Sequence, residues 1–243
     1  MVIKINIFYK IKNMGNNIKE NTFMKNTLFI ILVILFSSST YALEHSNWDF
    51  KKDGPFCPLL GYKMCTMEVY TGDIVKGDAN KLDGYISKLA KLEPSTRIGI
   101  IQISSNGGDV EEALRIGRTL RKNRIQVIIP MDSHCYSSCV LLLAGGVGRF
   151  PVGDVGIHSF YSMSSQKPNA DYEQEEKIYT ATEKSIRDYL NEMRVSGAVM
   201  DAMLRVPSSK LEILDVDKLK EYGLLGIDPV FNQYLLSNNY LSK

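Results

Sequence analysis

The sequence predicts one α/β domain, with a mainly parallel sheet flanked by helices, behind a targeting segment. Apolar runs that suit buried strands alternate with helical patterns, and glycines stand where strands turn into helices. Of the 243 residues, 44% are hydrophobic and 23% are charged, which suits one globular domain of about 200 residues. Alternating strands and helices form βαβ units with right-handed crossovers.

The expected elements begin at residue 65 with a short strand, Cys65–Tyr70. Ala79–Leu92 is a predicted helix because its apolar residues recur at helical spacing. Ile98–Ile103 is apolar on both faces, as expected of a strand inside a parallel sheet. Asp109–Lys122 is the clearest helix, since acidic residues occupy its first turn and basic residues its last.

The second half of the chain continues the alternation. We expect a strand at Ile125–Ile129, a buried apolar helix at Tyr136–Gly145 and a short strand at Val155–His158. A long charged helix at Asp171–Arg194 and a final short helix at Val216–Tyr222, capped by Gly223, should follow.

The first 42 residues are typical of an export signal. Residues 1–23 are rich in Lys, Asn and Ile without a pattern, and we interpret them as an over-extended start or n-region. Residues 24–42 hold a lysine, the apolar run Leu28–Phe36 and small residues before a cleavage site at Ala42, which predicts a signal peptide. That run is far shorter than the roughly 20 residues that span a bilayer.

We therefore expect a lead-in segment over 43–64, a folded domain over 65–243, and a periplasmic or secreted protein. The alternative is a membrane anchor over 27–42, and membrane association is expected only in that case. The formal net charge is +2, with five lysines in the first 42 residues. The remainder is nearly neutral and no basic face is implied, so nucleic acid is not an expected partner.

The four cysteines all follow Ala42 and predict disulfides. Cys57, Cys65, Cys135 and Cys139 allow three connectivities in an oxidising compartment, and we expect nearest neighbours to pair. Cys135 and Cys139 would stand about 6 Å apart between Cα atoms on one helix face. The alternative is a structural zinc held with His134, but no second metal-binding pair accompanies them. No metal or other cofactor is expected.

Three segments carry groups suited to acyl transfer. Gly107 and Gly108 follow a strand and open a helix, where backbone N–H groups suit an oxyanion. Ser137 and Ser138 open the next helix, and His158 ends the following strand. Taken singly, these residues also fit an ordinary turn, a helix N-cap and a half-buried histidine. Together they provide a nucleophile, a base and an oxyanion hole.

The motifs SSNGGDV, CYSSCVLLLAGG, GIH and EYGL over residues 65–228 resemble the Clp protease proteolytic subunit of the ClpP/crotonase superfamily. The likeness is closer to exported bacterial ClpP-like proteins with a C-x-S-x-C motif. The resemblance implies repeated β-β-α and βαβ units, Ser137 as nucleophile and His158 as base. It also implies oxyanion donors at Gly107 and Ser138, a peptide or protein substrate, and a homo-oligomer assembled through the long helix. No partner ATPase is expected outside the cytoplasm.

One member of the family's catalytic triad is missing. The family's Asp falls at Pro207-Ser208, where no carboxylate stands. Asp201 and Asp171 do not match that position, and Ser208 or Ser209 is the alternative orienting group. Membrane-bound relatives use a Ser/Lys dyad, for which Lys177 is the counterpart and alternative base.

The sequence thus favours an exported serine hydrolase, most simply a peptidase. The alternatives are a weak or inactive binding or scaffold protein on the same fold, a Ser137/Lys177 dyad peptidase, and acyl-CoA chemistry of the crotonase type. Export argues against the last of these, because CoA thioesters are cytosolic.

Overall fold

The computed structural model describes residues 43–48, 57, 64–92, 94–160 and 172–238. The predicted start segment, the signal peptide over 24–42, the alternative anchor over 27–42, most of the lead-in and Asp171 lie outside the described residues. Among the described helices, none is long and apolar enough to cross a membrane.

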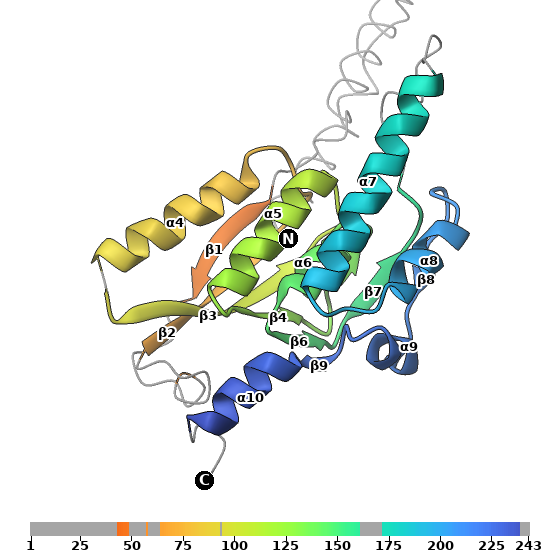
Figure 1. Cartoon of the computed structure of the whole chain (residues 1–243). Coiled ribbons are helices and arrows are strands. Elements are labelled where there is room, and N and C mark those ends of the chain that lie inside the picture. Colours follow the sequence, from red (N-terminus) through yellow and green to blue (C-terminus); the bar gives the residue numbers. More distant parts are fainter. Residues whose placement is uncertain (1–42, 49–56, 58–63, 93, 161–171, 239–243) are drawn as a thin grey trace, which may run out of the picture. The chain divides into compact units, whose positions relative to one another are not determined.

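The larger sheet has six strands in the order β1-β2-β3-β4-β6-β9 (Figure 1). Its centre is parallel, and β1 and β9 add to its edges in the antiparallel sense. The strands are β1 (Glu44–Trp48), β2 (Met64–Thr71), β3 (Thr96–Ser104), β4 (Gln126–Ile129), β6 (Gly148–Pro151) and β9 (Gly226–Ile227). Ile98, Ile101 and Ile103 of β3 are buried, which agrees with the strand expected inside a parallel sheet.

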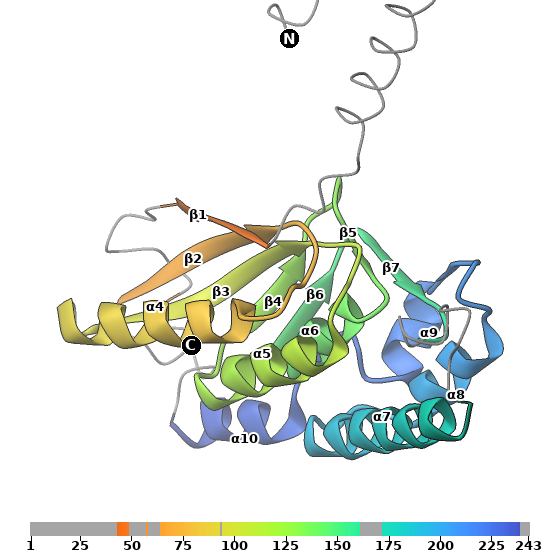
Figure 2. The same cartoon turned by 90° about the horizontal axis from the view of Figure 1, so that it is seen from above.

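A smaller sheet has three strands in the order β5-β7-β8 (Figure 2). It consists of β5 (His134–Tyr136), β7 (Asp154–Ile157) and β8 (Glu212–Ile213). β5 and β7 are parallel, with Tyr136 opposite Gly156. A bridge between Ser105 and Cys135 links this sheet to the end of β3.

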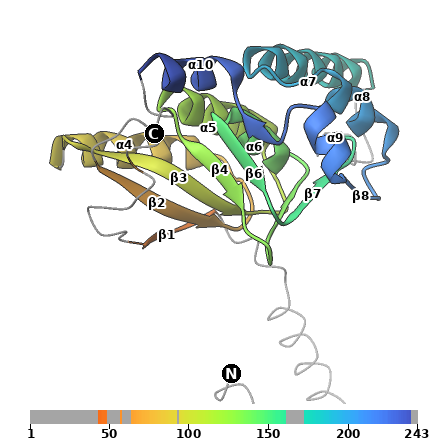
Figure 3. The same cartoon turned by 90° about the horizontal axis from the view of Figure 1, so that it is seen from below.

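The helices flank the sheets as predicted, with α4 and α5 side by side along one face of the larger sheet (Figures 2 and 3). Thr119 of α5 donates a 2.8 Å hydrogen bond to Asp83 of α4. The helices are α4 (Asp78–Leu92), α5 (Val110–Lys122), α6 (Cys139–Gly145), α7 (Tyr172–Glu192), α8 (Ala198–Arg205), α9 (Val216–Glu221) and α10 (Pro229–Ser237). The predicted fold class, a mainly parallel sheet flanked by helices, is confirmed.

Helix α6 is wholly buried, and two close contacts fix its position. Gly117 of α5 and Gly145 of α6 touch through their backbones: a Cβ on Gly145 would lie 2.5 Å from the Gly117 Cα. Tyr189 of α7 donates a 2.6 Å hydrogen bond to the Leu141 carbonyl of α6. Burial raises the pKa of Tyr189, so its hydroxyl stays protonated and remains a donor.

The structure corrects several expected boundaries. The predicted helix Tyr136–Gly145 is wrong at its start, because His134–Tyr136 forms strand β5 and α6 begins only at Cys139. His134 is therefore in a strand. The predicted lead-in contains strand β1, which pairs with β2. Strand β6 and helices α8 and α10 were not predicted, and Val216–Glu221 is not the last helix.

Candidate active site

Ser137, the predicted nucleophile, lies in the turn between β5 and α6 and is half-buried. Its φ is 56°, in the left-handed region that L-residues adopt at a cost. Its N–H donates to the Gly156 carbonyl of β7 (2.9 Å), and its carbonyl accepts from the Val140 N–H (3.1 Å). Its hydroxyl makes no hydrogen bond to another described residue. Two hydrogen bonds thus hold the backbone of Ser137, and among the described residues none engages its hydroxyl.

The glycine loop packs directly against this turn. A Cβ on Gly107 would lie 2.7 Å from the Tyr136 carbonyl oxygen and 2.8 Å from the Ser137 Cβ. A Cβ on Gly108 would lie 2.1 Å from the Ile74 carbonyl oxygen. Both glycines have positive φ, so no other residue fits either position without strain.

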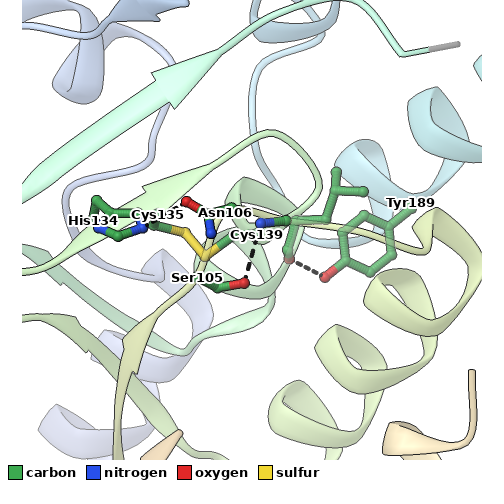
Figure 4. Close-up of a disulfide and its surroundings, with 8 residues drawn as sticks. Ser105, Asn106, His134, Cys135, Cys139 and Tyr189 are labelled. Atoms are coloured by element: carbon green, nitrogen blue, oxygen red, sulfur yellow. Dashed lines mark hydrogen bonds between the residues drawn. A yellow bond between two sulfur atoms is a disulfide. The ribbon is translucent and has the colours of Figure 1, made fainter. Parts of the chain in front are cut away.

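Three backbone N–H groups at this junction differ in their partners among the described residues. The Gly107 N–H, predicted as an oxyanion donor, donates to the Ser105 hydroxyl oxygen at 3.1 Å (Figure 4). By contrast, no hydrogen bond joins the N–H of Gly108 or Ser138 to another described residue. The Ser138 hydroxyl donates to the Gly108 carbonyl at 3.1 Å and does not cap α6. The sequence indicated both glycines as backbone donors, whereas the family resemblance pointed to Gly107 alone.

The polar side chains beside the glycine loop form a short chain. The His134 Nε2 lies 3.0 Å from the Asn106 Oδ1, and the Asn106 Nδ2 donates to Asp73 at 3.1 Å. The His134 ring stacks on Tyr136, with 4.5 Å between ring centroids. These contacts fix Asn106, which directly precedes Gly107 (Figure 4).

His158, the predicted base, directly follows β7 and is half-buried. The parallel pairing of β5 with β7 and the Ser137–Gly156 hydrogen bond bring this strand end beside Ser137. The Nδ1 of His158 lies 2.8 Å from the Ser159 carbonyl oxygen. A carbonyl only accepts, so Nδ1 carries a proton, and in the neutral tautomer Nε2 is the nitrogen left to accept one. The sequence held no signal for this partner, because it is a backbone atom.

Pro207 and Ser208, where the resembled family has its Asp, follow a residue that is hydrogen-bonded beside His158. The Ser159 N–H donates to the Val206 carbonyl at 2.7 Å, which brings the chain before Pro207 beside the histidine. Ser208 and Ser209 are exposed, and neither makes a hydrogen bond to His158. Asp201 pairs instead with Arg187 at 2.8 Å. The only described hydrogen-bond partner of the His158 ring is therefore a neutral carbonyl.

Lys177, the alternative base, lies on α7 with its side chain 72% exposed. Its Nζ lies 2.6 Å from the Glu173 carboxylate, one helical turn earlier. Its described partner is thus Glu173, and no described contact joins its Nζ to Ser137. The geometry of this helix therefore gives no support to the dyad.

The predicted disulfides are confirmed. Cys57 pairs with Cys65, with 5.4 Å between Cα atoms, and Cys135 pairs with Cys139, with 5.2 Å. The zinc alternative is wrong for this structure, since a disulfide leaves neither sulfur free as a thiolate ligand. Cys135 and Cys139 stand on a strand and a helix respectively, not on one helix face.

Comparison with solved structures supports the fold. The chain is similar to a mutant of ClpP1 from Listeria monocytogenes, with a TM-score of 0.50 and 18% sequence identity, over 66% of this chain and 88% of that one. It is also similar to a mutant of the membrane-bound, stomatin-specific protease 1510-N, with a TM-score of 0.48 and 18% identity, over 70% and 81% of the two chains. No family model and no curated protein matches the sequence. The chain has a ClpP-like fold.

Proposed function

We propose that this protein is a serine peptidase in which Ser137 is the nucleophile and His158 is the general base. The observation that carries the proposal is the junction of β5, β7 and the glycine loop. There a left-handed serine, whose hydroxyl has no partner among the described residues, is hydrogen-bonded to the strand that directly precedes His158. The backbone of Gly107 packs against the same serine.

The chemistry follows from these groups. The Nε2 of His158 accepts the Ser137 proton as Oγ attacks a substrate carbonyl, and then passes the proton to the leaving amine. The Ser138 N–H and the Gly108 N–H stabilise the tetrahedral oxyanion. The Gly107 N–H joins them only if it releases Ser105, to which it now donates. Water then hydrolyses the acyl-enzyme with His158 again as base.

The neutral partner of His158 has a consequence for rate. The Ser159 carbonyl fixes the productive tautomer, as a triad carboxylate would, but it carries no charge to stabilise the imidazolium. We therefore expect turnover below that of an enzyme with a full triad.

Location and substrate belong to the same proposal. Two disulfides in one chain favour an oxidising compartment, which agrees with the predicted signal peptide and a periplasmic or secreted protein. The substrate is a peptide or an unfolded protein segment, and the chain acts as a homo-oligomer. Both rest on analogy with proteases of this fold.

The test is reaction of the oxidised protein with a fluorophosphonate probe, beside Ser137→Ala, His158→Ala and a matched control, Ser185→Ala. Ser185 is exposed on α7, so its loss leaves the site intact. We expect wild type and Ser185→Ala to label equally, and both other variants to lose labelling. Labelling that survives Ser137→Ala refutes the assignment of the nucleophile.

A second candidate function is a non-catalytic binding or scaffold protein. The observation that favours it is the absence of a carboxylate from the described hydrogen-bond partners of His158. Wild type that is folded but unlabelled, at every pH tested, would support this candidate over the peptidase.

A further inference from the structure

The Cys135–Cys139 disulfide encloses the proposed nucleophile. Only Tyr136, Ser137 and Ser138 lie between its two half-cystines. Both half-cystines are fully buried, at 0% exposure, and Figure 4 shows the bridge between them. The bridge therefore spans the nucleophile and one oxyanion donor at once.

Both ends of the bridge are anchored in rigid elements. Cys135 pairs with Val155 on β7 and forms a bridge to Ser105 at the end of β3. Cys139 is the first residue of α6, which the Tyr189 hydrogen bond and the Gly117–Gly145 contact hold in place. Neither end can move far without disturbing the core.

The chain between these ends has little freedom. Only two residues, Ser137 and Ser138, connect β5 to α6, while the Cα atoms of Cys135 and Cys139 stay 5.2 Å apart. Ser137 takes φ of 56° within this loop, whereas Ser138 is already helical with φ of −61°. Besides the bridge, Ser137 is held by hydrogen bonds with Gly156 and Val140, and Ser138 by hydrogen bonds with Gly108 and Leu141.

We propose that the Cys135–Cys139 disulfide is a positioning group for catalysis, which holds Ser137 in its left-handed conformation beside His158 and the Ser138 N–H. This inference rests on the proposed function of Ser137. If the inference is right, loss of the bridge lowers the reactivity of Ser137 as well as the stability of the fold.

The first experiment compares Cys135→Ala/Cys139→Ala with the matched control Cys57→Ala/Cys65→Ala. The control bridge also closes a short loop, with a sequence separation of 8 against 4, so the chain-entropy effects of the two on stability are similar. Cys65 pairs with Arg97 near the start of β3, whereas the glycine loop follows the other end of that strand. The control bridge is therefore remote from Ser137.

The readout is the fluorophosphonate reaction, separated into the inactivation rate constant and the probe's dissociation constant. Misplacing a reacting atom by about 1 Å lowers a rate on the order of 10²-fold. We expect such a fall in the rate constant for Cys135→Ala/Cys139→Ala, with an unchanged dissociation constant, and no fall for the control. Equal rate constants in both variants, with Ser137 still labelled, refute the positioning role and leave the proposed function intact.

A second measurement does not depend on reactivity. Glycine tolerates positive φ, so Ser137→Gly should raise the folding equilibrium constant about threefold where the bridge enforces that conformation. We expect this gain in the bridged protein and its loss in Cys135→Ala/Cys139→Ala, measured by urea unfolding. The same gain in both backgrounds overturns the inference. If wild type is never labelled, the proposed function fails. The comparison of Ser137→Gly in the two backgrounds then still decides whether the bridge holds Ser137.

Discussion

Replacing Ser137 with glycine should stabilise the protein while it removes the proposed nucleophile. Ser137 has φ of 56°, and its hydroxyl makes no hydrogen bond to another described residue. The substitution therefore removes a strained side chain and sacrifices no described polar contact. A residue kept at the expense of stability is expected at a functional site.

The magnitude follows from two opposing effects. Relief of the left-handed conformation is worth roughly 1–2 kcal/mol. The greater freedom of glycine in the unfolded chain opposes this by roughly 0.4–1 kcal/mol. We expect a net gain of about 0.5–1 kcal/mol, which for a domain of this size raises Tm by about 2–3 °C. Ser137→Ala keeps the strain and should show no such gain.

The assay is urea and thermal unfolding of the oxidised protein, followed by circular dichroism. Ser185→Gly is the matched control, because Ser185 lies inside α7, where glycine costs about 0.5 kcal/mol relative to serine. Arg194→Gly is the positive control, since Arg194 is exposed and also has φ of 56°. If Ser137→Gly destabilises the protein as Ser185→Gly does, Ser137 is not left-handed and the argument for a strained nucleophile fails.

Two further predictions concern the scaffold. Gly117→Ala should destabilise by about 3 kcal/mol, because its Cβ would lie 1.7 Å from the Tyr189 hydroxyl and break the hydrogen bond to Leu141. Gly84→Ala, with nothing within 4 Å of the new Cβ, should instead stabilise by about 0.5–1 kcal/mol. Equal thermal shifts in the two variants would contradict this account of the α5–α6 contact. Burial raises the pKa of Glu112, but the Ala79 and Gly77 N–H groups and Arg115 outweigh it and leave that pKa lowered. A lowered folded pKa contributes stability above the ordinary pKa of the group, and this contribution is lost as pH falls through the folded pKa. Glu112→Gln should therefore be less stable than wild type near pH 7, with the difference disappearing in acid, whereas the exposed neighbour Glu111→Gln should change stability little at either pH. A deficit in Glu112→Gln that persists in acid would show that charge is not its cause.

The elements with strong periodicity were predictable from the sequence. Helix α5 matches the expected range apart from Asp109, which is its N-cap. Strand β3 contains the whole predicted run Ile98–Ile103. Strand β5 was missed because three residues carry too little pattern to separate a strand from the apolar helix that follows. Its identity depends on pairing with β7 and with Ser105, which are distant in sequence.

The sequence by itself determined the alternation of strands and helices, the even set of cysteines, and the order of glycine loop, serine and histidine. These are local or ordinal properties, so composition and spacing are enough to reveal them. Only the tertiary structure decided that Ser137 has a left-handed φ and that Gly107 packs against the Cβ of Ser137. It further decided that the Ser159 carbonyl is the partner of His158. It also decided that the Cys135–Cys139 bridge joins a strand to a helix around the serine. Each of these depends on the three-dimensional packing of the chain, including strands and loops far apart in sequence, which no local pattern records.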